Sequence, residues 1–106
     1  MQTIWKYGID PDIVIQTYRM PKGAIVLSIG DDPHGKMCFW AQVDPCAPLE
    51  DHLVACVGTG WEIDNMFADG RYVNFIGTVT RGAYVWHMFD LGESVKDRNE
   101  DSHESV

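Results

Sequence analysis

The sequence predicts an all-β, mainly antiparallel domain, and three observations indicate this fold class. The apolar residues before position 92 occur in short runs separated by clusters of glycine, proline and aspartate, as in chains of many strands. Within several runs, side chains alternate with the period of two that places neighbours on opposite faces of a sheet. The chain of 106 residues has the length of one compact domain. We therefore expect a small β-sandwich or open barrel of about six or seven short strands.

Seven runs are expected to form the strands. In chain order they are residues 4–7, 13–20, 24–30, 37–43, 53–61, 72–80 and 83–90. The breaks between them hold residues that fix φ, tolerate positive φ or bond to their own backbone: 10–12 (Asp-Pro-Asp), 21–23 (Pro-Lys-Gly), 30–35 and 44–48. Residues 62–69 are compatible with one helical turn, which Asp69-Gly70 would end.

The strand expected at 37–43 shows the clearest alternation. One face carries Met37, Phe39, Ala41 and Val43, and the other carries Cys38, Trp40 and Gln42. The run at 24–30 likewise places its large apolar side chains on one face. We expect these apolar faces to form part of the core.

The last hairpin allows two registers. A two-residue loop Arg81-Gly82 would place Arg81 at positive φ, so a three-residue loop at 80–82 with Gly82 in the left-handed region is expected. The resulting cross-strand pairs are Val79 with Ala83, Gly77 with Val85, Phe75 with His87, and Val73 with Phe89. In this register one face is apolar except for His87, which is interpreted as a core histidine whose polar atoms have partners.

The opposite face of the hairpin, together with that of the strand at 37–43, is rich in aromatic residues. The candidate partner or dimer face consists of Trp40, Tyr72, Ile76, Tyr84, Trp86 and Met88. These residue types are enriched at protein interfaces, and two-fold dimers are the commonest closed assemblies. The alternative is that another segment, residues 5–9 or 62–69, covers this face to make a second core.

The cysteines and histidines give no coherent catalytic or metal-ligating set. Cys38, Cys46 and Cys56 have no close pair, so we expect three reduced thiols and neither a structural zinc nor another cofactor. A small hydrolase or transferase that pairs Cys46 with His52 or His87 remains the enzymatic alternative.

The net charge of −8 disfavours direct binding to nucleic acid, although it permits an acidic mimic of nucleic acid. The longest apolar runs, 24–27 and 53–57, are too short for a membrane span, and no secretion signal is recognised at the N-terminus. We therefore expect a cytoplasmic protein.

Residues 92–106 form an acidic segment with two valines as its large apolar residues. Such a segment buries too little apolar surface to offset its ordering entropy. The predicted organisation is one β domain at 1–91 followed by a disordered tail.

The order of several short motifs carries a resemblance that covers residues 1 to about 90. The motifs are Trp-Lys-Tyr at 5–7, Met-Pro-Lys-Gly-Ala at 20–24, Cys-Phe-Trp-Ala-Gln-Val-Asp-Pro at 38–45, Gly-Thr-Gly at 58–60, Ile-Gly-Thr at 76–78 and Tyr-Val-Trp-His-Met-Phe at 84–89. Together they resemble a family of small proteins encoded by tailed bacteriophages and prophages, which has no assigned activity. The sequence departs from that family in a longer stretch between Gly60 and Ile76 and in its acidic tail.

The resemblance implies a phage or prophage origin, a location in the host cytoplasm and an accessory role during infection. Combined with the acidic charge and the aromatic face, it favours a non-enzymatic module that binds a host or phage protein. Inhibition of a host defence protein is one form that such binding could take.

Overall fold

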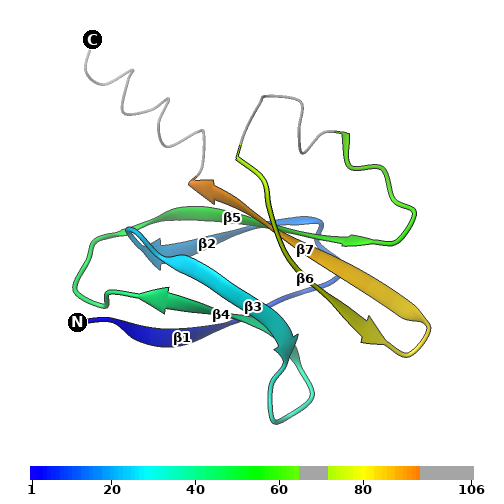
Figure 1. Ribbon diagram of the computed structural model, residues 1–106, viewed down its shortest axis with the longest axis horizontal. Helices are drawn as coiled ribbons and strands as arrows, with labels where there is room; N and C mark the ends of the chain where they lie inside the picture. Colours follow the sequence, from blue (N-terminus) through cyan, green and yellow to red (C-terminus); the bar gives the residue numbers. More distant parts are fainter. Residues whose placement is uncertain (65–71, 94–106) are drawn as a thin grey trace.

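The computed structural model describes residues 1–64 and 72–93, in which seven antiparallel strands form two sheets (Figure 1). The first sheet has the order β1-β4-β3, with β1 at Thr3–Gly8, β4 at Met37–Val43 and β3 at Ile25–Asp31. The second has the order β2-β5-β7-β6, with β2 at Ile15–Pro21, β5 at Leu49–Gly58, β7 at Tyr84–Glu93 and β6 at Asn74–Arg81. The prediction of an all-β antiparallel fold is confirmed.

Most strand ends differ from their predicted positions, and the largest differences are in β5, which begins at Leu49 and not at 53, and in β7. β5 stops at Gly58 instead of continuing to 61, because the amide of Trp61 donates to the carbonyl of Gly58 and closes a turn there. β7 continues to Glu93, so Gly92 and Glu93 belong to the sheet and not to the predicted tail. Residues 94–106 lie outside the described residues, and their disorder stays a prediction.

The core lies between the two sheets and confirms the alternation predicted for β4. Its fully buried side chains include Phe39, Val43, Met20, Val54 and Met88. Tyr7 stacks on Phe39 with ring centroids 5.1 Å apart, and Tyr18 meets the same ring edge-on at 5.1 Å. These aromatic contacts connect both sheets, because Tyr7 and Phe39 come from the first sheet and Tyr18 from the second.

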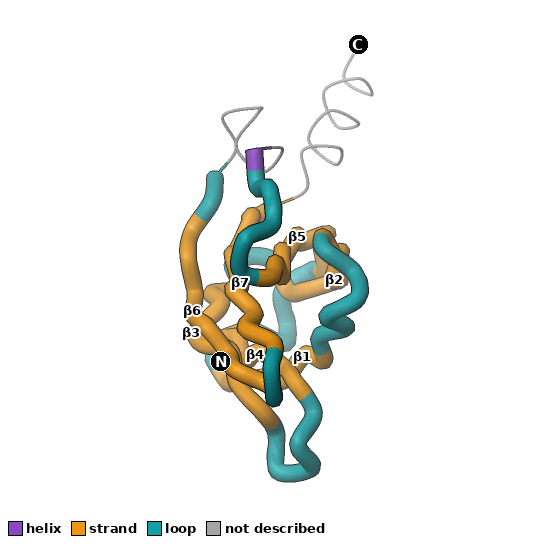
Figure 2. The backbone as a smooth tube through the Cα atoms, turned by 90° about the vertical axis from the view of Figure 1, so that its right-hand side faces the viewer, coloured by secondary structure: helices purple, strands orange, loops and turns teal. Residues whose placement is uncertain are grey.

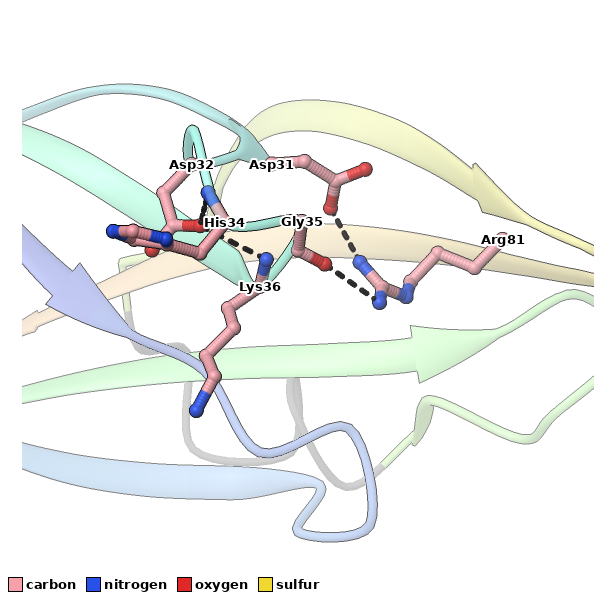
Figure 3. A network of polar contacts seen from close by, with 6 residues as sticks. All are labelled: Asp31, Asp32, His34, Gly35, Lys36 and Arg81. Atoms are coloured by element: carbon pink, nitrogen blue, oxygen red, sulfur yellow. Dashed lines mark hydrogen bonds and ion pairs between the residues drawn. The ribbon is translucent and has the colours of Figure 1, made fainter.

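Along one side of the sandwich, strands β3 and β6 lie next to each other (Figures 1 and 2). A Cβ atom on Gly77 would lie 3.0 Å from Cγ2 of Ile29, so the absence of a side chain permits this approach. Arg81 connects the same two strands through an ion pair with Asp31 and a 2.9 Å bond to the carbonyl of Gly35 (Figure 3). The sandwich is therefore closed on this side by side-chain contacts.

The turn between β3 and β4 is organised by Asp32 (Figure 3). Its carboxylate accepts hydrogen bonds from the amides of Lys36 at 2.9 Å and His34 at 2.8 Å, and from Nζ of Lys6 at 3.0 Å. The Lys36 amide first, and then the Lys6 side chain, lower the pKa of Asp32 to about 2.

The register predicted for the last hairpin is wrong. The loop has two residues, Gly82 and Ala83, which brings Arg81 opposite Tyr84 and Val79 opposite Trp86. Gly82 adopts the expected positive φ, 58°, but it occupies the first central position of the turn, as in a type II′ hairpin, where glycine is favoured.

As a consequence, the β7 side chains that were expected on the face away from the core point into the core, and those expected in the core lie on the outer face. Trp86 and Met88 point toward the core, whereas His87 and Phe89 lie on the outer face of the sheet. A bulge between Phe75 and Gly77 then allows Ile76 to reach the core as well. His87 therefore has Thr78 as its cross-strand partner in place of the predicted Phe75.

A second, smaller apolar cluster lies on that outer face. Ala55, Val57 and Leu91 are buried there, and Leu53, Ile63, Val73 and Phe89 pack against them. Ile63 therefore packs on the face opposite to Trp86 and Met88, and not on the aromatic face that the segment 62–69 was expected to cover. Residues 65–71 lie outside the described part of the chain.

Candidate functional site

The structure does not bring the six residues of the predicted aromatic face together. Met88 is completely buried, and Ile76 and Trp86 are partly buried against the core. Trp40 lies on the outer face of the first sheet, where its ring covers Gly30. Tyr72 and Tyr84 are 60 % and 68 % exposed. The exchanged faces of β7 explain why these residues do not share one face.

Two of the six residues, Tyr84 and Trp86, belong to a smaller aromatic site that also includes Trp61. Tyr84 stacks beside Trp86 with ring centroids 6.1 Å apart and an interplanar angle of 19°. Trp61 meets Trp86 almost at right angles, at 5.4 Å and 84°. These three rings border a cavity of about 220 Å³, which we call the aromatic pocket; Gly58, Thr59, Ala83 and Val85 complete its lining.

Trp61 reaches this position because of the turn that follows β5. Gly60 adopts φ 89°, and the Trp61 amide closes the turn on the carbonyl of Gly58 at 3.2 Å. The ring of Trp61 then lies where a side chain of residue 58 would be, since a Cβ atom there would be 2.9 Å from the ring. Glycine at position 58 therefore makes room for one wall of the pocket.

The turn is attached to β7 by Thr59. Its amide donates to the carbonyl of Val85 at 3.3 Å, and its Oγ1 lies 2.7 Å from Nε2 of His87. The other ring nitrogen of His87, Nδ1, lies 3.0 Å from Oγ1 of Thr78. His87 is therefore half-buried on the outer face with a partner at each nitrogen, and the prediction that it lies in the core is wrong.

The charges around the aromatic pocket are unequal. Glu62 and Asp64 are exposed and follow Trp61 directly in the chain. The nearest cation on the hairpin, Arg81 opposite Tyr84, has its guanidinium paired with Asp31. Aromatic faces near acidic residues are suited to a cationic side chain.

A second hollow, of about 250 Å³, opens between the sheets at the other end of β7. Its wall contains His52 and Asp90, the two buried polar residues of the described chain, with Nε2 of His52 2.6 Å from Oδ1 of Asp90. Glu50, Glu93 and Tyr72 also line it. We call this hollow the inter-sheet pocket.

Sequence reasoning missed the inter-sheet pocket because its members are far apart in the chain. His52 and Asp90 are separated by 38 residues, and a bulge near Leu91 decides which side chains of β7 face inward. The alternation Glu50, His52, Val54 on β5 was the one sequence feature that could have indicated polar residues on an inner face.

Comparison with known proteins assigns the chain to a family. Residues 1–99 match the family described as Domain of unknown function (DUF7352). The chain belongs to this family. No curated protein and no solved structure gives a significant match.

The described residues contain no helix that is long and apolar enough to cross a membrane.

The cysteines do not assemble with a histidine in the described residues. Cys38 and Cys56 are buried, and burial raises the pKa of Cys38 and raises that of Cys56 to about 11, which keeps both thiols protonated near neutral pH. Cys46 is an exposed, free thiol. The hydrogen-bond partners of the two proposed bases are Asp90 for His52 and threonines for His87.

Proposed function

We propose that this DUF7352 protein is a non-enzymatic protein-binding module whose contact site is the aromatic pocket. The observation that supports the proposal most directly is the arrangement of Trp61, Tyr84 and Trp86 around one cavity, with Trp61 47 % and Tyr84 68 % exposed. Aromatic side chains that border a pocket contribute a large share of binding energy at protein interfaces. The contacts of Thr59 with β7 hold the turn that carries Trp61, and such preorganisation reduces the entropy lost on binding.

The occupant that fits the pocket best is an arginine or lysine side chain of the partner protein. The net charge of −8 attracts basic surfaces, and the exposed residues Glu62 and Asp64 follow Trp61 in the chain. A cation over an indole or phenol ring gains about 0.5–2 kcal/mol, depending on how far water is excluded. The cavity of about 220 Å³, with the small residue Ala83 in its lining, has room for such a side chain.

The biological setting is part of the same proposal. The resemblance to phage and prophage proteins supports an accessory role in the cytoplasm of a bacterial host, with a host or phage protein as partner. Inhibition of a host defence protein is compatible with a module that occupies a basic surface.

Capture from host lysate, followed by binding of the purified partner, tests this function. We expect the wild type and an F75A variant, which lacks an exposed aromatic ring outside the pocket, to bind the same partner. The W61S and Y84S variants should lose at least about tenfold in affinity, as expected for aromatic anchors. Equal affinity for all four proteins, or turnover of a substrate without any partner, would overturn the proposal.

A further inference from the structure

The inter-sheet pocket contains a pair of carboxyl groups in an unusual position. Glu50 lies near the start of β5, and Glu93 is the last residue of β7. The register of the two strands places Glu93 opposite His52, so Glu50 and Glu93 are close neighbours on adjacent strands. Both side chains line the inter-sheet pocket, and the hydrogen bond between them that raises the pKa of Glu50 requires that one of the two carboxyl groups carries a proton.

Of the other groups around this pair, two partly offset the negative charge of Glu50. His52, on the same strand, is already bonded to Asp90 of β7. Lys22 acts on Glu50 through its charge, and the amide of Gly23 donates to it, both from the turn after β2. Tyr72 contributes an aromatic ring to the lining. Glu50, Glu93 and Asp90 thus bring three carboxyl groups together with the imidazole of His52 and the ammonium group of Lys22.

We propose that Glu50 and Glu93 form a pH-dependent latch that fastens the end of β7 to β5 when they share a proton and loosens it when both are ionised. Gly92, next to the pair, donates its amide to Asp90 Oδ1 at 2.9 Å, and its φ of 73° marks the irregular end of the strand. Loosening of the latch therefore acts on Gly92 and Glu93, which line this end of the inter-sheet pocket. It also acts on the point where the chain continues into the acidic residues after 93.

The direction of the pH effect follows from the chemistry of the pair. Burial, and then the charge and hydrogen bond of Glu93, raise the pKa of Glu50 above its ordinary value of 4.5. A raised carboxyl pKa stabilises the closed latch below the ordinary value, and this stabilisation is lost as pH rises through the raised pKa. Acidification therefore closes the latch, and neutral pH favours the open form.

Amide hydrogen exchange measured by NMR tests the latch on the full chain. After correction for intrinsic exchange rates, the opening constant at the Gly92 and Glu93 amides should rise about tenfold between about pH 4 and about pH 7. In E50Q the glutamine amide donates to Glu93 at every pH, so the opening constant should stay low and constant. The matched control E62Q changes an exposed glutamate that does not line this pocket and should behave like the wild type.

The E93Q variant provides an independent check, because it replaces the other carboxyl group of the pair. It should also abolish the pH dependence, and the amides of β4 should show no such dependence in any variant. A wild type whose opening constant at Gly92 and Glu93 does not change with pH would overturn the proposal. The same pH dependence in E50Q or E93Q as in the wild type would overturn it as well.

Discussion

Oγ1 of Thr59 lies 2.7 Å from Nε2 of His87, and this contact fastens the turn that carries Trp61 to strand β7. A threonine hydroxyl can donate or accept, so the contact persists with either neutral tautomer of the histidine. Through this contact, the position of Trp61, which forms one wall of the aromatic pocket, depends on His87 on the outer face of the sheet.

The first prediction concerns this contact. T59V retains the shape of the side chain but removes the hydroxyl, which should lower the free energy of unfolding by up to about 1 kcal/mol because the site is exposed. The emission of Trp61 should shift to longer wavelength as the turn loosens. Chemical unfolding and tryptophan fluorescence measure both effects, and T17V, on the distant strand β2, is the control. Identical emission spectra of T59V and the wild type would show that the contact does not position the turn.

The second prediction uses Gly58. In G58A the new methyl group would lie 2.9 Å from the Trp61 ring, so the ring must move and the pocket must change shape. We expect partner affinity to fall by at least about tenfold while the domain stays folded. G8A is the matched control, since a Cβ atom on Gly8 meets nothing within 4 Å. Wild-type affinity of G58A would mean that the pocket is not the contact site.

The alternation that predicted the core face of β4 worked because β4 itself runs without a bulge, and Met37, Phe39 and Val43 all lie in the core. The one register shift beside it lies in β3, between Val26 and Ser28. The same reasoning failed for β7. The bulge at Ile76 and the position of Gly82 within the turn shift the register, and neither leaves a distinct pattern in the sequence. The aromatic pocket was therefore predicted only in part, since Trp61 comes from a turn that pattern analysis assigned to a strand.

The third prediction concerns the closure between β3 and β6. R81M removes the ion pair with Asp31 and the bond to Gly35, and because these groups are partly exposed we expect a loss of about 0.5–1 kcal/mol in unfolding free energy. K36M changes the charge equally on the neighbouring turn, where the Lys36 side chain points away from Arg81 (Figure 3), and should cost less. Unfolding in denaturant at low and high salt measures the difference. A smaller loss for R81M than for K36M would contradict the proposed closure.

The fourth prediction follows from the pKa of Asp32, which its hydrogen bonds lower from 3.8 to about 2. A lowered carboxyl pKa stabilises the fold above the ordinary value, and this contribution disappears as pH falls through the lowered pKa. The melting temperature of the wild type should therefore decrease more between about pH 4 and about pH 2 than that of D32N. D12N, a variant of an exposed aspartate, should follow the wild type. Parallel curves for D32N and the wild type would contradict the assigned role.

The fifth prediction addresses the cysteines. In the native protein at neutral pH, a thiol reagent should modify Cys46 and leave Cys38 and Cys56 unmodified, because the latter two are buried. Labelling followed by peptide mass analysis distinguishes the three sites. Labelling of Cys46 much faster than that of a small free thiol would instead favour the alternative of a cysteine-dependent enzyme.

The most direct test of the central claim compares two short peptides that differ in one side chain, arginine or the uncharged norleucine. Calorimetric titration should show that the arginine peptide binds the wild type at least about fivefold more tightly than the norleucine peptide, and that W61S and Y84S remove this difference. The preference should also decrease with salt, because Glu62 and Asp64 contribute through charge. Equal affinity for the two peptides, or an arginine preference that persists in both variants, would contradict the account.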